Sequence, residues 1–145
     1  MIRDYIHKVH YHETDKMGVT HHANYIKWME EARVAFLDSI GLPFRKMEEG
    51  GILSPVVAVS VEYKTPSTFD DEIQVEVEVE KYNGVELSVR YLMKNTATGS
   101  VVATAASRHC FLKDGRICSQ QRVAAPMHEI LDRVARGTDT GETNG

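Results

Sequence analysis

Residues 72–81 alternate between apolar and acidic side chains, the period of two expected of a strand that buries one face. A turn signal, Asn83-Gly84, follows, and apolar residues then recur at alternate positions from Leu87 to Met93. These two patterns and the turn between them predict an antiparallel hairpin. Its buried face on the first strand is formed by Ile73, Val75, Val77 and Val79.

The register of this hairpin follows from the need to keep both apolar faces on the same side of the sheet. A strict two-residue loop would pair Val79 with Ser88 and put the two faces on opposite sides. Pairing Val79 with Val89 keeps the faces together, but it needs one extra residue. We therefore predict a three-residue loop or a bulge near Gly84.

Residues 23–40 carry the longest helical pattern, and their apolar positions cover more than one stripe. The pattern predicts a helix that is buried on much of its circumference. Gly41 and Pro43 are typical of a helix end. A short helix is expected over residues 44–49 and a C-terminal helix over 127–135. Further strands are expected over residues 2–12, 55–64, 100–112 and 116–120.

One strand, a long helix and then about four antiparallel strands define an α+β order. A helix that is apolar on nearly all sides must bury those sides against other elements. We therefore predict an antiparallel sheet of about five strands wrapped around a long central helix. Residues 1–136 are assigned to one domain, an ordinary size for a single core. The tail, residues 137–145, has no apolar anchor and is expected to be disordered.

Composition narrows the possible partners. The chain has 145 residues, with 17 basic and 21 acidic side chains and a net charge of −4. It has no basic stripe, which argues against a nucleic-acid partner. The sequence shows no apolar stretch long enough to cross a bilayer and no signal-peptide pattern at its start. Cys110 and Cys118 flank an Asp-Gly turn that would point them to opposite faces, so a disulfide is disfavoured. We expect a cytoplasmic protein without membrane insertion.

The segment 11–25 concentrates the candidate chemistry. Asp15 lies some seven residues before the predicted helix and is therefore not its cap by sequence. It could be a turn former, because short acidic side chains bind nearby backbone N–H groups. Alternatively, Gly18 lets the loop fold tightly, so that Asp15 approaches a ligand at the helix N-terminus. The unpaired N–H groups and positive dipole end there would polarise a carbonyl.

The histidines allow a second hypothesis. His10, His12, His21 and His22 lie close in sequence, and three or four of them could surround a zinc ion. Their spacing defines no tetrahedral set, so we interpret them as partly exposed polar residues near a cleft. We predict no metal and no separate cofactor.

The segment as a whole resembles a known active-site motif, that of hotdog-fold acyl-CoA thioesterases. The likeness is to the 4-hydroxybenzoyl-CoA thioesterase-like branch, of the type associated with the Tol-Pal system. Residues 63–67, Tyr-Lys-Thr-Pro-Ser, match a second landmark of that family. The first motif consists of Tyr11, Asp15, Gly18, His22, Asn24 and Tyr25, followed by a helix with Glu30 and Arg33.

The resemblance implies a role for each matching residue. Asp15 would be the catalytic carboxylate, acting as a nucleophile or as a general base on water. His22 would open the central helix, and its backbone N–H would polarise the thioester carbonyl. Tyr11 matches a tyrosine beside the aspartate. Substrate contacts are assigned to Gly18, Asn24, Tyr25, Tyr63 and Lys64.

The implied activity is hydrolysis of an acyl-CoA thioester to a free carboxylic acid and CoA, with coenzyme A as part of the substrate. The family implies a homodimer or homotetramer with sites at the subunit interface. Two alternatives stay open. An acyl-thioester hydratase or dehydratase would use His22 and Glu30 for proton transfer and leave Asp15 idle. A non-catalytic acyl-CoA binding module would bind the thioester without cleaving it.

Overall fold

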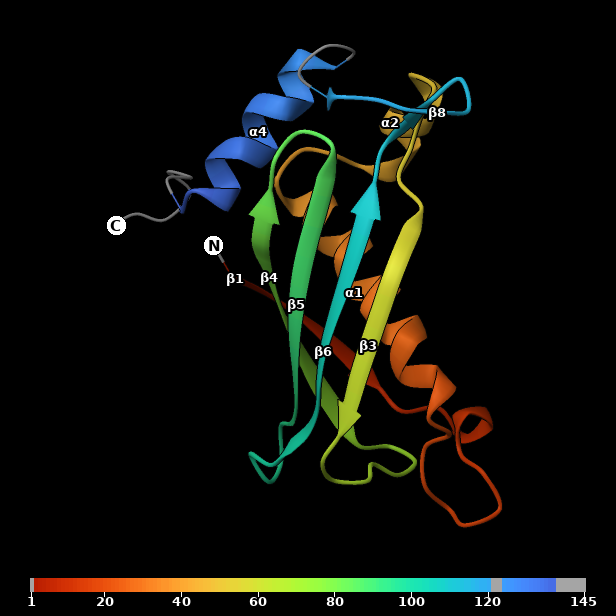
Figure 1. The fold of residues 1–145 in the computed structure, drawn as a ribbon. Helices are drawn as coiled ribbons and strands as arrows, with labels where there is room; N and C mark the ends of the chain where they lie inside the picture. The colour runs from red at the N-terminus through yellow and green to blue at the C-terminus, as the bar shows by residue number, and fades with distance from the viewer. Residues whose placement is uncertain (1, 121–123, 138–145) are drawn as a thin grey trace.

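The computed structural model describes residues 2–120 and 124–137. Its main feature is a five-stranded antiparallel sheet with the strand order β1-β4-β5-β6-β3 (Figure 1). The predicted α+β class and the antiparallel sheet of about five strands are thereby confirmed. The strands are β1 (Ile2–Lys8), β3 (Val56–Tyr63), β4 (Glu72–Tyr82), β5 (Glu86–Asn95) and β6 (Val101–Cys110).

The helix α1 (Ala23–Ser39) lies behind this sheet in Figure 1 and has 17 residues. A second, three-stranded sheet has the order β2-β7-β8, and the sequence did not predict it as a sheet because two-residue strands carry no periodic signal. Most of the tail assigned as disordered lies outside the described residues. The remaining elements are η1 (Tyr11–Glu13), α2 (Phe44–Glu49), β2 (Ile52–Leu53), β7 (Leu112–Lys113), β8 (Arg116–Ile117) and α4 (Ala125–Ala135).

The hairpin of β4 and β5 has the predicted register. Val79 pairs with Val89, and the apolar face of β4 is buried. The position of the extra residue differs from the prediction. The register shifts between Val79 and Lys81, not near Gly84. Gly84 has a φ of 92°, which lets the turn close tightly, so the bulge falls within the strand instead.

The hairpin at the Asp-Gly turn also agrees with the sequence. Lys113 pairs with Arg116, and the two cysteines are free. Asp114 and Gly115 both have positive φ, at 55° and 78°, as a two-residue hairpin turn requires. Across the described residues, no helix combines the length and apolar character needed to span a bilayer.

Burial of α1 differs from the prediction. Its buried side chains fall on one stripe at helical spacing, and most of its other residues are exposed in the single chain. Ile26 is 43% exposed, and Ala35 is exposed as well. The expectation of burial on much of the circumference is therefore wrong for the isolated chain. The buried stripe consists of Tyr25, Trp28, Met29, Ala32, Arg33, Phe36 and Leu37.

Candidate active site

Asp15 opens a tight loop between η1 and α1. Thr14 and Thr20 form an isolated bridge, and the Gly18 N–H donates to the Asp15 carbonyl at 3.0 Å. Gly18 has a φ of 80°, which favours glycine here. The exposed Asp15 carboxylate accepts a hydrogen bond from the Met17 N–H at 2.8 Å through Oδ1. Asp15 is thus a turn former, but Oδ2 has no hydrogen-bond donor among the described residues and stays available to a ligand.

The closing end of this loop is attached to the segment before β4. The Thr20 N–H donates to the Ser67 carbonyl at 2.8 Å, and the two hydroxyl oxygens lie 2.7 Å apart. The buried Tyr25 hydroxyl lies 2.9 Å from Ser67 Oγ. These contacts join the loop, the first turn of α1 and Ser67. The predicted substrate residue Tyr25 therefore contributes to holding the helix start in place.

The N-terminus of α1 offers one free backbone donor. His22 has helical dihedrals (φ −57°, ψ −31°), and its N–H has no hydrogen-bond acceptor in the described part of the chain. The next donor, the Ala23 N–H, is capped by Nδ1 of His21 at 3.2 Å. Tyr63 donates its hydroxyl hydrogen to the His22 carbonyl at 2.9 Å. The positive end of the helix dipole therefore carries an unused N–H at His22.

The other predicted residues lie around this end of the molecule. Tyr11 is 76% exposed, and its ring contacts Phe69 edge-on with centroids 5.7 Å apart. Asn24 donates from Nδ2 to the Glu13 carbonyl at 2.9 Å, and Lys64 pairs with Glu62 at 3.0 Å. The structure thus joins Tyr63 directly to His22. Among the described residues, no contact joins the side chain of Asp15 to His22 or to Tyr11.

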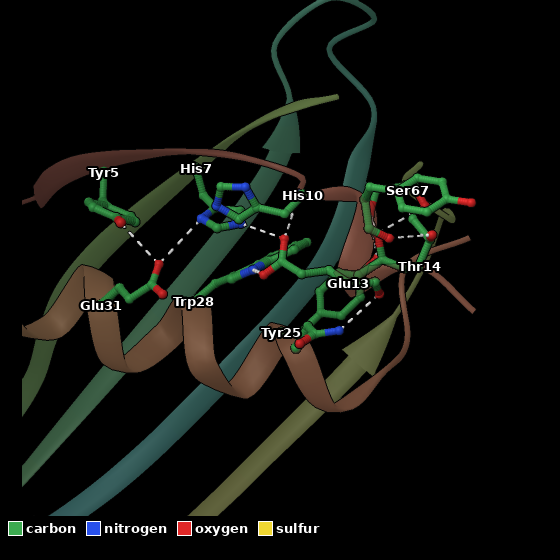
Figure 2. A network of polar contacts seen from close by, with 12 residues as sticks. Tyr5, His7, His10, Glu13, Thr14, Tyr25, Trp28, Glu31 and Ser67 are labelled. Atoms are coloured by element: carbon green, nitrogen blue, oxygen red, sulfur yellow. Dashed lines mark hydrogen bonds and ion pairs between the residues drawn. The ribbon is translucent and has the colours of Figure 1, made fainter. Parts of the chain in front are cut away.

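Glu13, which the sequence reasoning missed, is the buried anchor of the segment (Figure 2). Its Oε1 accepts hydrogen bonds from His7 Nε2 at 2.9 Å and from the His10 N–H at 2.8 Å. Its Oε2 accepts one from Trp28 Nε1 at 2.9 Å. The contact with the His10 N–H is the returning half of a capping box, so Glu13 lying three residues after His10 was a detectable signal.

Glu13 is held as an anion. Burial alone would raise the pKa of its carboxyl, but the hydrogen bonds from His7, His10 and Trp28 outweigh burial and lower that pKa. His7 continues the network, since its Nδ1 lies 3.3 Å from Glu31, which also accepts the Tyr5 hydroxyl hydrogen at 3.0 Å (Figure 2). Glu13 therefore ties β1, η1 and α1 together. The strand predicted over residues 2–12 ends at Lys8, because the chain forms η1 from Tyr11 to Glu13 instead of continuing as a strand.

The histidines that cluster in the structure are not the set that the sequence suggested for zinc. Potential ligand atoms of His7, His10 and Glu13 lie within 4.8 Å of one another. His10 stacks on His12, and His21 stacks on His22, with ring centroids 5.2 and 4.4 Å apart. Both oxygens of Glu13 are already engaged by protein donors, so hydrogen bonding accounts for this cluster. The absence of a metal stays a prediction.

A second buried polar cluster lies further along α1. Arg33 and His109 are 5% and 1% exposed, and Nη1 of Arg33 lies 2.9 Å from His109 Nδ1. Ser107 Oγ lies 2.7 Å from His109 Nε2 and 2.7 Å from the Tyr91 hydroxyl. Burial, and then the charge of Arg33, lower the pKa of His109 to about 3. This imidazole is therefore neutral near neutral pH.

This cluster predicts acid sensitivity. Above about pH 6.5 His109 is neutral in both the folded and the unfolded chain and contributes nothing to pH dependence. Between that pH and the folded pKa of about 3, only the unfolded chain takes up the proton, so acid weakens the fold. The variant His109→Gln stays neutral and should lose about 2–3 kcal/mol less stability than wild type between about pH 6.5 and pH 4.5. Urea unfolding at both pH values measures this, and equal losses in the two proteins would refute it.

Comparison with known proteins assigns the family. Residues 9–134 match the model of the Thioesterase-like superfamily. The chain therefore belongs to this superfamily, which confirms the class of enzyme predicted from the sequence.

Individual relatives agree with that class. "Putative acyl-CoA thioesterase YneP" of Bacillus subtilis (strain 168) is 36% identical over 119 residues, 82% of this chain and 86% of that protein. "Acyl-CoA thioesterase YbgC" of Haemophilus influenzae is 32% identical over 91 residues, 61% of this chain and 67% of that protein. The solved structure of a DHNA-CoA thioesterase from Staphylococcus aureus has a TM-score of 0.91 and 28% identity, covering 99% of this chain and 97% of that one.

Proposed function

We propose that the chain hydrolyses acyl-CoA thioesters to a free carboxylic acid and CoA at the N-terminus of α1. The observation that carries the proposal is the unused N–H of His22 at a helix start, a short loop away from Asp15, in a chain of the Thioesterase-like superfamily. The names of the relatives support an acyl-CoA substrate.

The chemistry fits the residues. The thioester carbonyl oxygen would accept the His22 N–H, and the helix dipole would stabilise the negative charge that develops on that oxygen. One such donor contributes about 3–4 kcal/mol of transition-state stabilisation in known enzymes. The free oxygen of Asp15 would either attack the carbonyl carbon or take a proton from the attacking water. In the general-base route water supplies the new carboxyl oxygen of the acid directly. In the attack route the acyl group first forms an anhydride with Asp15, and water then hydrolyses that anhydride. In both routes the CoA sulfur leaves and is protonated.

Two routes for Asp15 are distinguished by isotope labelling. In a single turnover in ¹⁸O water, an attacking carboxylate would first form an anhydride, whose hydrolysis can leave the label in Asp15. A general base would leave all the label in the released acid. Mass spectrometry of the peptide that contains Asp15 reads the outcome.

Assembly into a dimer is part of the proposal. β3 lies at the open edge of the sheet (Figure 1), and it exposes several apolar side chains, with Val56 at 51%, Val57 at 49% and Tyr63 at 47%. Edge strands with this character pair readily with another chain. Pairing of two β3 strands would cover the exposed apolar residues of α1, such as Ile26, and extend the sheet around both helices. It would also enclose Tyr63 beside His22 at a subunit interface.

The dimer proposal predicts the effect of a charge on β3. Val57→Lys should convert the protein to a monomer and lower kcat/KM for acyl-CoA hydrolysis by about tenfold or more, because an ammonium group cannot be buried there without a partner. Analytical ultracentrifugation and a thiol-release assay measure both effects. Ile117→Lys is the matched control, since Ile117 is 67% exposed but lies on β8. A monomeric wild type with full activity would contradict the proposal.

The direct test of function is a panel of short, long and aromatic acyl-CoA thioesters. Ellman's reagent reports release of free thiol, and absorbance of the enoyl group reports the competing hydratase or dehydratase chemistry. Thiol release is the expected result. Saturable binding without thiol release would instead identify a binding module.

Narrower assignments follow from the same proposal. The 4-hydroxybenzoyl-CoA thioesterase-like branch, the Tol-Pal-associated type and a cytoplasmic location stay predictions. Tyr63 and Lys64 are both exposed, and Tyr63 is hydrogen-bonded to the helix start, so these side chains are accessible to a substrate there. Gly18 and Asn24 would act through the shape of the loop and its attachment to Glu13.

A further inference from the structure

A cavity of about 250 Å³ lies between α1 and the strands β3, β5 and β6. Its walls are apolar near the helix N-terminus, where Ile26, Met29 and Val59 line it. Its other end is polar and is formed by the buried cluster of Arg33, Tyr91, Ser107 and His109. An apolar pocket with a few convergent polar groups is the usual form of a small-molecule site.

Arg33 is a buried cation without a counter-ion. It is 5% exposed, and in the described part of the chain no carboxylate lies within ion-pair distance of its guanidinium. Its Nε is fully buried and has no hydrogen-bond acceptor among the described residues, whereas Nη1 contacts the imidazole of His109. The guanidinium also lies over the Phe44 ring, with Cζ 5.4 Å from the ring centroid, but an aromatic ring supplies no negative charge. A buried charge normally requires a partner, because its desolvation costs several kcal/mol.

The hydrogen-bond order in this cluster leaves a second donor free. Arg33 can only donate, and its Nη1 lies 2.9 Å from Nδ1 and 3.1 Å from Nε2 of the neutral His109. We assign the acceptor to the nearer nitrogen, Nδ1. In that tautomer His109 Nε2 donates to Ser107 Oγ, and the Ser107 hydroxyl donates to the Tyr91 oxygen. Burial raises the pKa of Tyr91, so its phenol stays protonated. With this assignment the Tyr91 hydrogen has no acceptor among the described residues.

The remaining charges around the cavity do not cancel Arg33. Lys27 and Glu30, both exposed, also line it, and the negative charge of Glu30 acts on Arg33 from beyond ion-pair distance. The three charges together leave the cavity with one net positive charge, and its buried polar cluster supplies hydrogen-bond donors. That combination suits a negatively charged oxygen group rather than an all-apolar chain.

The position of the cavity relates it to the proposed reaction site. Ile26 lies one helical turn beyond His22 on α1, and Arg33 lies eleven residues beyond, about 16 Å along the helix axis. Tyr63, bonded to the His22 carbonyl, belongs to the same strand as Val59. The cavity thus continues along α1 from the place where the thioester carbonyl would bind.

We propose that this cavity is an acyl-binding pocket that recognises a carboxylate at the far end of the acyl chain, with Arg33 and the Tyr91 hydroxyl as its ligands. The substrate class is then a medium-chain ω-carboxyacyl thioester, the monothioester of a dicarboxylic acid. This inference rests on the proposed thioesterase activity, and it adds the chemical nature of the acyl group.

The test compares acyl-CoA thioesters matched in carbon number. Adipoyl-, suberoyl- and sebacoyl-CoA carry the terminal carboxylate, and hexanoyl-, octanoyl- and decanoyl-CoA lack it. In wild type, kcat/KM for the best carboxylated thioester should exceed that for its apolar match by about tenfold or more. Equal or lower values would overturn the inference while leaving the thioesterase proposal intact. Absence of thiol release from every thioester would instead count against the thioesterase proposal itself.

Two variants test whether Arg33 and Tyr91 cause the preference for carboxylated thioesters. Arg33→Met removes the charge while keeping the length of the side chain, and Tyr91→Phe removes only the hydroxyl. Each should lower the ratio of the two kcat/KM values, Arg33→Met by about tenfold or more. Arg108→Met is the control, because Arg108 is exposed next to His109 and pairs with Glu86. A ratio that is unchanged in a folded Tyr91→Phe and a folded Arg33→Met, or that falls equally in Arg108→Met, would overturn the assignment of the pocket.

Discussion

Replacement of Asp15 by asparagine will lower kcat for acyl-CoA hydrolysis by about 10³-fold while leaving the fold unchanged. The expected loss is that of a nucleophile or general base, because an amide neither attacks the carbonyl nor accepts the proton from water. The fold should survive because Asn Oδ1 can accept the same hydrogen bond from the Met17 N–H that Asp15 accepts now. Steady-state thiol release measures kcat, and circular dichroism with urea unfolding measures the fold.

A matched control separates chemistry from turn structure. Asp114 is also an exposed aspartate in a tight turn, with a φ of 55° that asparagine tolerates. Asp114→Asn should leave kcat unchanged. If a folded Asp15→Asn protein kept near-normal turnover, Asp15 would not be the catalytic carboxylate.

His22→Ala should lower kcat less than Asp15→Asn does, because the backbone N–H is retained. An equal loss of kcat would mean that the imidazole takes part in the chemistry.

The second large effect is expected at Glu13. Glu13→Ala should lower the free energy of unfolding by about 3–5 kcal/mol at pH 7, the cost of breaking a buried, charged hydrogen-bond network. The substitution removes the acceptor of three donors, those of His7, His10 and Trp28, and leaves the donors of His7 and Trp28 buried without one. Urea unfolding followed by tryptophan fluorescence is suitable, because Trp28 is itself a member of the network.

Glu31→Ala provides the comparison for this prediction. Glu31 also faces His7, but its side chain is 43% exposed, so its removal should cost about 1 kcal/mol or less. Because the pKa of Glu13 is lowered on folding, its charge stabilises the fold above the ordinary carboxyl pKa, and this contribution is lost as pH falls through the folded pKa. The difference between wild type and Glu13→Ala should therefore shrink in acid. Equal stability of Glu13→Ala and wild type at pH 7 would contradict the anchoring role.

The sequence predicted the sheet well because its signals are local. The alternation from Ile73 to Val79 fixed the buried face of β4, and the need to bury both faces together fixed its pairing with Val89. The end of α1 was also predicted, because Gly41 and Pro43 are typical of the residues that follow a helix. Within this hairpin, the position of the bulge was the part predicted wrongly, because a longer turn and an extra residue in a strand satisfy the same register requirement.

The polar interior could not be predicted in the same way. Glu13 lies buried because its partners come from three places in the chain, His7 before it, the His10 backbone and Trp28 on the helix. Likewise, Arg33 meets His109 across 76 positions of sequence. No local pattern encodes such a contact. The exposed face of α1 was mispredicted for a related reason, since Ile26 is apolar without a partner in the single chain.

The candidate site was likewise predicted only in part. The motif identified Asp15 and His22, and their neighbourhood contains the loop and the free helix-start donor that the chemistry needs. It did not reveal that His21 caps Ala23, nor that Asn24 and Tyr25 are engaged with Glu13 and Ser67. These contacts depend on how the loop closes in space, which spacing alone does not specify.

The most direct test is a crystal structure with a non-hydrolysable acyl-CoA analogue in which a methylene group lies between the carbonyl and sulfur. The account predicts that the analogue's carbonyl oxygen accepts the His22 N–H at about 3 Å and that a carboxylate oxygen of Asp15, from either copy of the chain, lies within about 3–3.5 Å of the carbonyl carbon or of a water poised on it. A carbonyl group bound elsewhere, with Asp15 facing bulk solvent in every copy, would contradict it.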